Sequence, residues 1–213
     1  MKTYPSRCAL WLTLLWLLPI LLIRAQPYHD SDLRASLAPP DGCSAPCFMG
    51  IRPGTTTTAE AIAILEHHAW VAQVSPTDPD IVERPDTGLV GSPVVRWRWS
   101  ELRPAWIAPE PGGELWTVDQ HVRFLKISTQ FSLGDVRLSL GNPDDEYTSA
   151  FANLTGHFWF YDGWYRDHNT LLATSGFCPL KLSDLYFRQT LLQFQASPPE
   201  FDGASSVGSA CDE

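Results

Sequence analysis

The sequence has little lysine, and it lacks the common catalytic and nucleotide-binding motifs. Only Lys126 and Lys181 follow the first 25 residues. No serine lies in a Gly-x-Ser-x-Gly elbow, and the Gly-x-x-x-x-Gly-Lys pattern of a phosphate-binding loop is absent. These absences argue against an α/β-hydrolase and against a P-loop nucleotide-binding protein. They favour a protein that is not an enzyme.

Long apolar runs are also missing, except at the N-terminus. Lys2 and Arg7 precede a largely apolar stretch over residues 8–23. Its length lies between the apolar core of a signal peptide, roughly 7–15 residues, and a membrane span of about 20 residues. We therefore expect residues 1–25 to be a hydrophobic helix that acts either as a cleaved signal peptide or as an N-terminal membrane anchor. In both cases the rest of the chain is exported.

Positive charge is scarce in the exported part. The whole chain carries a net charge of −9, and three of its basic residues but none of its acids lie in the first 25 residues. Removing those three basic residues takes the net charge from −9 to −12. An acidic protein repels phosphate backbones, so nucleic acid is excluded as the expected partner. The negative charge of the exported part is explained sufficiently by its contribution to solubility.

Four cysteines remain after the one at position 8, and an even number in an exported chain favours disulfides. They allow three pairings. We expect Cys43–Cys47, because a short loop with a proline joins these two residues, and Cys178–Cys211. A thioredoxin-like redox site needs two intervening residues instead of three, and a zinc site needs closer ligand pairs than these.

Two helix starts carry the same pattern about 75 residues apart. Thr57 is followed three residues later by Glu60, and Ser132 is followed in the same way by Asp135. A hydroxyl residue with an acid three positions on, before an apolar run, is typical of a capping box. The pattern predicts two short helices, the second ending at Gly141.

Strand-forming stretches surround these helices. Alternating or β-branched and aromatic residues predict strands over 95–99, 115–128 and 157–165, and a strand or a helix over 185–194. Asp162-Gly163 lies between two aromatic runs, and this dipeptide predicts a hairpin turn.

The order of predicted elements, a helix followed by strands, occurs twice in the chain, and this repetition predicts an α+β fold. We expect two helix-then-antiparallel-strand repeats sharing one sheet, preceded by the N-terminal hydrophobic helix. Each short helix alone covers too little apolar surface of the sheet, so each half needs the other half to cover its apolar face. The expected segments are a signal or anchor (1–25), a linker (26–42), a first repeat (43–130), a second repeat (131–195) and a flexible tail (196–213).

Short motifs in both halves resemble the SmpA/OmlA (BamE-like) and β-lactamase-inhibitor-protein group of tandem α/β repeats. The stretch 46–57 also resembles a group of uncharacterised exported bacterial proteins. The resemblance implies a non-catalytic module that binds another protein. The matching residues are Gly54, Thr55 and Leu65 in the first half and Leu133, Val136, Leu140, Gly141, Pro143, Trp159 and Tyr161 in the second.

We therefore expect an exported protein-interaction module with an envelope or extracellular partner, and with no cofactor and no metal. It would be secreted, periplasmic or anchored to the cytoplasmic membrane. One alternative is a module that binds glycans or cell wall through exposed tryptophans. Another is a hydrolase whose acid pair the sequence does not identify. The residues predicted to bind are Trp97, Trp99, Trp159, Tyr161, Trp164 and Tyr165.

Overall fold

The computed structural model describes the chain in several stretches. These are Leu15, Leu17, residues 30–40, 42–78, 94–153, 156–179, 181, 186–199 and Cys211. Asp32–Glu213 form one compact unit. The expected N-terminal helix and most of the expected tail lie outside the described residues. Among the helices that are described, none is long and apolar enough to cross a membrane.

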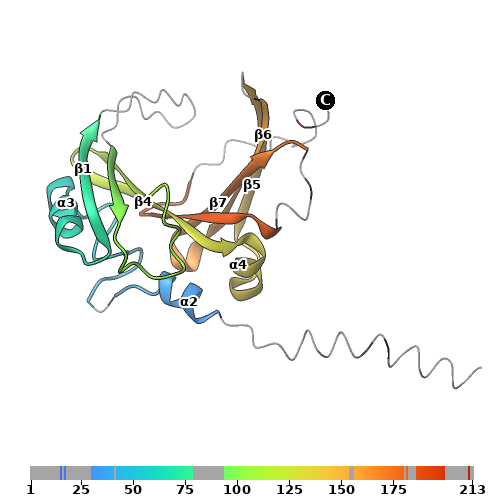
Figure 1. The fold of residues 1–213 in the computed structure, drawn as a ribbon, viewed down its shortest axis with the longest axis horizontal. Coiled ribbons are helices and arrows are strands. Elements are labelled where there is room, and N and C mark those ends of the chain that lie inside the picture. The colour runs from blue at the N-terminus through green and yellow to red at the C-terminus, as the bar shows by residue number, and fades with distance from the viewer. Residues whose placement is uncertain are drawn as a thin grey trace, which may run out of the picture. The chain divides into compact units, whose positions relative to one another are not determined.

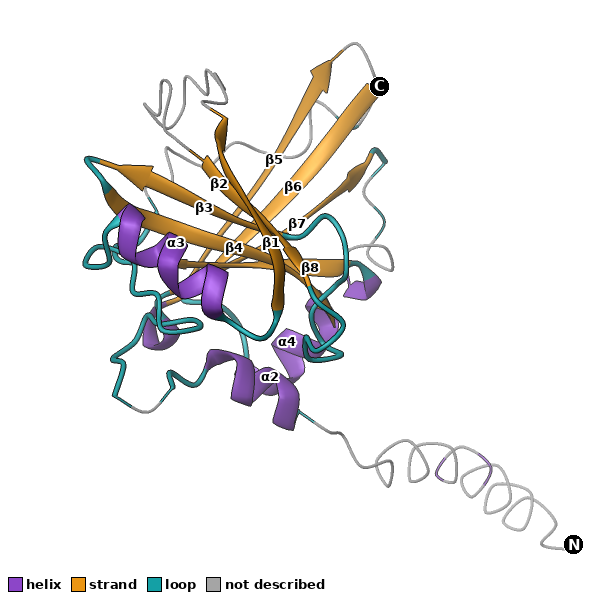
Figure 2. Cartoon of the chain, turned by 60° about the vertical axis from the view of Figure 1, so that its left-hand side comes forward, coloured by secondary structure: helices purple, strands orange, loops and turns teal. Residues whose placement is uncertain are grey.

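One antiparallel sheet of eight strands dominates this unit (Figures 1 and 2). Its order is β1-β2-β3-β4-β8-β7-β6-β5, so two runs of four consecutive strands meet where β4 pairs with β8. The strands are β1 (Val71–Asp78), β2 (Val94–Trp99), β3 (Gly113–Val118), β4 (His121–Ser132), β5 (Asp145–Asn153), β6 (Gly156–Tyr165), β7 (Thr170–Phe177) and β8 (Gln189–Gln195).

The helices of the described residues are short. They are α2 (Ser31–Leu37), α3 (Thr58–His67), α4 (Leu133–Leu140) and the 3₁₀ turn η1 (Arg166–His168). Part of the expected linker is thus helical, and Leu33 and Leu37 of α2 are buried.

Both predicted capping boxes are present. The Thr57 backbone N–H donates to Glu60 at 2.9 Å, and the Glu60 N–H donates to the Thr57 hydroxyl at 3.3 Å. Ser132 and Asp135 make the same pair of contacts at 2.9 and 3.1 Å.

The predicted fold class, an α+β fold of two helix-then-strand repeats, is wrong. The described part is mostly an eight-stranded antiparallel sheet, and its three α-helices have only 7, 10 and 8 residues. The capping patterns indicated correctly where α3 and α4 begin. They say nothing about how much of the chain forms strands. Strands form over longer stretches than the alternation of apolar residues suggested, and they include the polar run Asp145–Asn153.

The hairpin turn predicted at Asp162-Gly163 is also wrong, because β6 continues through both residues. Gly163 does not form a turn. It allows neighbouring side chains to pack closely against the strand. A side chain at this position would meet the Tyr161 hydroxyl at 2.9 Å and Pro143 at 3.2 Å. The turn between β3 and β4 falls at Asp119 and Gln120, both of which have positive φ.

The helices pack on one face of the sheet, which we call the helix face. Buried apolar residues of α2, α3 and α4 join one core cluster with strand residues such as Trp97, Leu125, Leu172 and Leu192. Gly113 permits this packing, since a side chain there would overlap the Trp97 indole. Figure 2 shows α3 lying against the sheet near β4.

The structure contains both expected disulfides. Cys43 and Cys47 are joined over a separation of four residues, and Cys178 and Cys211 over a separation of 33. Disulfides form and persist in oxidising compartments, so they place this chain in an oxidising, extracytoplasmic environment.

Replacing the N-cap residue of α3 tests whether the predicted capping box stabilises the helix. Thr57→Ala removes the hydroxyl that accepts from Glu60, and we expect the free energy of unfolding to fall by about 1 kcal/mol. Urea denaturation measures this change. Thr55→Ala in the same loop is the control, because the Thr55 hydroxyl only donates to the Arg52 carbonyl at 3.3 Å. Equal losses in both variants would contradict the capping role.

Candidate functional site

The six aromatic residues predicted to bind are buried, with exposed fractions of 8 % or less. All except Trp164 belong to the core cluster of the helix face. Side chains in the core cannot form the exposed aromatic surface on which the glycan hypothesis depends. The residues concerned are Trp97, Trp99, Trp159, Tyr161, Trp164 and Tyr165.

The opposite face of the sheet offers a different surface, which we call the open face. Residues paired directly across an antiparallel sheet point to the same side, so the register defines one row across all eight strands. Three residues of this row, Trp164, Leu171 and Gln193, are buried, with exposed fractions of 8 % or less, so only the other five reach the surface. The row is Ser75, Arg96, Glu114, Lys126, Gln193, Leu171, Trp164 and Asp145.

Charged and aromatic groups meet on the open face over β2, β3 and β4. Arg96 donates to Glu114 at 3.0 Å, and their side chains are 45 % and 35 % exposed. The Lys126 ammonium lies 5.8 Å from the ring centroid of Trp116 and 5.0 Å from that of Phe124. The attraction between a cation and aromatic faces contributes to holding the Lys126 ammonium there. This arrangement gives the open face fixed groups of both charge signs beside an aromatic pair.

Two N–H donors lie beneath this part of the open face. Gln193 donates to the Gln195 side-chain oxygen at 2.5 Å. The Gln195 amide nitrogen and the Trp116 indole nitrogen are both buried, and neither has a hydrogen-bond partner among the described residues. Leaving a buried donor unsatisfied costs about 1–3 kcal/mol.

Aromatic side chains also occupy the far end of the open face. The Phe158 and Phe177 rings lie 4.7 Å apart on β6 and β7, and Phe177 is 62 % exposed. Phe160 and Ser175 form the next pair along the same two strands. The open face therefore runs from a charged region over β2–β4 to an aromatic region over β6 and β7.

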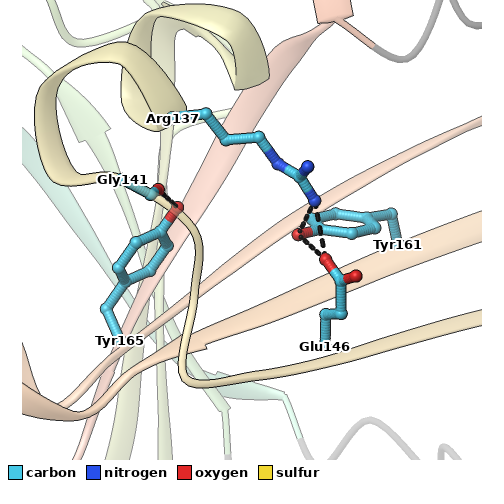
Figure 3. Close-up of polar contacts among 5 residues, drawn as sticks. All are labelled: Arg137, Gly141, Glu146, Tyr161 and Tyr165. Carbon is cyan, nitrogen blue, oxygen red and sulfur yellow. Dashed lines mark hydrogen bonds and ion pairs between the residues drawn. The ribbon is translucent and has the colours of Figure 1, made fainter.

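A polar cluster ties α4 to the sheet on the helix face (Figure 3). Arg137 of α4 donates to Glu146 at 2.6 Å and to the Tyr161 hydroxyl at 2.8 Å, and this hydroxyl donates to the same Glu146 oxygen at 3.1 Å. The Tyr165 hydroxyl donates to the Gly141 carbonyl at the end of α4, at 3.2 Å. Two tyrosines thus hold the second half of the helix.

The electrostatics of this cluster suit a structural role. Burial raises the pKa of Tyr161 well above its ordinary value of 10, although the hydrogen bond from Arg137 opposes the shift. Burial also opposes the charge of Arg137, but contact with Tyr161 and Glu146 leaves its pKa raised. Tyr161 is therefore neutral and Arg137 charged at any physiological pH, and Tyr161 has no capacity to act as a base there.

Other concave or ligand-rich features are limited. A shallow depression of about 570 Å³ lies beside α3. Its carboxylate, Glu60, already accepts hydrogen bonds in the capping box. Within the described ranges, no three His, Cys, Asp or Glu side chains gather closely enough to hold a metal ion. The depression is lined by Arg52, Thr55, Thr56, Glu60, Ala63 and Ile64.

No protein-family model, curated protein or solved structure matches this chain.

Sequence reasoning missed the open face, although one signal for it was present. The alternation in Val94–Trp99 already placed Arg96 and Arg98 on the face of the strand that the tryptophans do not occupy. The same reasoning could have placed Lys126 and Ile127 on different faces of their strand. The register that aligns these residues with β8 depends on pairing distant segments, which single-strand patterns do not specify.

Removing the Tyr161 hydroxyl tests the cluster. Tyr161→Phe breaks hydrogen bonds to two charged groups, and we expect the free energy of unfolding to fall by about 1.5 kcal/mol. Tyr165→Phe is the matched control, because it removes one neutral hydrogen bond on the same strand and should cost about half as much. Urea denaturation compares the two variants. A larger loss in the control would show that the charged network contributes little.

Alkaline pH provides a separate test through Tyr165. Burial raises the pKa of Tyr165 from 10 to about 12. A pKa raised on folding adds stability that is complete below pH 10 and is lost as the pH rises towards 12. We expect the midpoint of urea denaturation to fall over this range by less in Tyr165→Phe than in the unmodified chain. Identical pH profiles would contradict the shift.

Proposed function

We propose that this chain is an exported, non-enzymatic module that binds a partner protein on its open face. The observation that carries the proposal is the exposed part of the open face, where Arg96 and Glu114 lie over β2 and β3 and Phe177 lies over β7. The helices of the described residues pack on the other face. The exposed positions of the open face, which include Arg96 and Ser175, suit a surface that meets another molecule.

The chemistry of the open face favours protein over nucleic acid. Arginine, tryptophan and other aromatic residues dominate the binding energy of protein interfaces. Arg96, Trp116 and Phe177 supply such groups here. The net charge of −9 disfavours a phosphate backbone. The partner we propose presents both an acidic and a basic group opposite Lys126 and the Arg96–Glu114 pair.

The proposed place of action is outside the cytoplasm. Two disulfides and the apolar stretch 8–23 support an exported protein. We propose a partner in the envelope or the extracellular medium, with the chain either released or anchored through residues 1–25. Cell fractionation separates these two forms, since release yields a soluble, shortened protein.

Blocking the open face tests the binding proposal. Ser75→Arg and Ser175→Arg each place a long side chain among exposed positions at opposite ends of this face. We expect either change to reduce recovery of the partner from envelope extract by roughly tenfold or more, because a bulky charge prevents close packing. Quantitative affinity capture with mass spectrometry measures the recovery.

The matched control adds the same side chain on the opposite side of the molecule. Ala63→Arg lies at an exposed position of α3 and should leave capture unchanged. Equal melting temperatures for all variants would establish that folding is intact. A partner captured equally well by the open-face variants and the control would place the binding surface elsewhere, and no specific partner at all would count against the function.

A further inference from the structure

The sheet ends in two edge strands that differ in their protection. A free edge presents unpaired N–H and C=O groups, and proteins usually block it with proline, lysine, bulges or a covering element. Strand β1 has such protection. It contains Pro76, its register with β2 shifts twice, and α3 packs beside it.

Strand β5 has none of these features among the described residues. Nine consecutive residues pair with β6 without a register shift. The sequence of β5, Asp-Glu-Tyr-Thr-Ser-Ala-Phe-Ala-Asn, contains no proline, lysine or arginine. Of the described strands, only β6 pairs with it. At about 3.4 Å per residue, β5 is a straight edge roughly 30 Å long.

We propose that β5 pairs antiparallel with β5 of a second copy of this chain, which joins the two sheets at this edge. Two-fold symmetry makes such a contact self-complementary. Full overlap of the nine residues places the two-fold axis at Ser149, the central residue of Asp145–Asn153. Each Asp145 then lies opposite Asn153 of the second copy, and each Glu146 opposite Ala152.

Charge selects this antiparallel arrangement. The acids of β5 occupy one end only, so antiparallel pairing separates the two acidic ends by roughly 27 Å. Parallel pairing would bring like charges together, which is destabilising. The acids are also paired within their own chain, Asp145 with Arg166 at 3.5 Å and Glu146 with Arg137 at 2.6 Å. Their charge therefore does not need a partner from the second copy.

Small side chains permit the approach. Thr148, Ser149 and Ala150 occupy the centre of β5, where the two strands would meet. Because strand addition extends a sheet within its own plane, it uses main-chain hydrogen bonds and leaves the two faces available. The edge contact is therefore separate from the binding proposed for the open face.

A charge swap at the two-fold axis tests the edge contact in the full chain. Ser149→Lys places two lysines opposite each other, and Ser149→Glu does the same with two carboxylates. We expect the unmodified chain to be a dimer by analytical ultracentrifugation, and each variant alone to dissociate at least about fivefold more readily. An equimolar mixture of the two variants should restore the dimer, which a merely misfolded variant could not do.

Gln73→Lys is the control, because it adds the same charge to an exposed position on the protected edge strand β1. It should leave the dimer unchanged. A chain that remains monomeric over its whole soluble concentration range overturns the proposal. So does a dimer that Gln73→Lys weakens while Ser149→Lys does not. Neither result bears on partner capture by the open face, which the arginine variants test separately.

Discussion

The pairing of β4 with β8 is the interaction on which the rest of the structure depends. It makes one sheet from two runs of four strands, and a buried hydrogen bond from the Thr129 hydroxyl to the Thr190 carbonyl, at 2.9 Å, lies within it. Without this pairing the open-face row would break between Lys126 and Gln193. The core of the helix face would divide at the same place, because side chains of both runs contribute to it.

Features determined by neighbouring residues could be predicted from the sequence. The capping boxes of α3 and α4 and the Cys43–Cys47 disulfide each depend on residues three or four positions apart. The fold class was predicted wrongly because strand content depends on pairing between distant segments, which can recruit a polar stretch such as β5. Asp162-Gly163 shows the same effect, since a strong local turn signal yields to pairing on both sides of β6.

The candidate site followed a similar division. Six aromatic residues were predicted to bind a partner, but their period-two spacing does not say which face becomes the core. The structure places Trp97 and Trp159 under the helices and leaves Trp116 beside Lys126 on the other side. That choice depends on which face α3 and α4 cover, and also on the small residues Gly113 and Gly176, which make room for the two buried indoles.

The separation between β4 and β8 also has a consequence for biogenesis. Thr129 and Thr190 are 61 residues apart, so β4 emerges during synthesis and export well before its second neighbour exists. Over that interval β4, the longest strand of the described sheet, presents one unpaired side. Non-local strand pairing is slow, and unpaired strand edges in partly folded chains promote aggregation. The interval before β8 is available is therefore the stage at which the edge of β4 is most exposed to pairing with another chain.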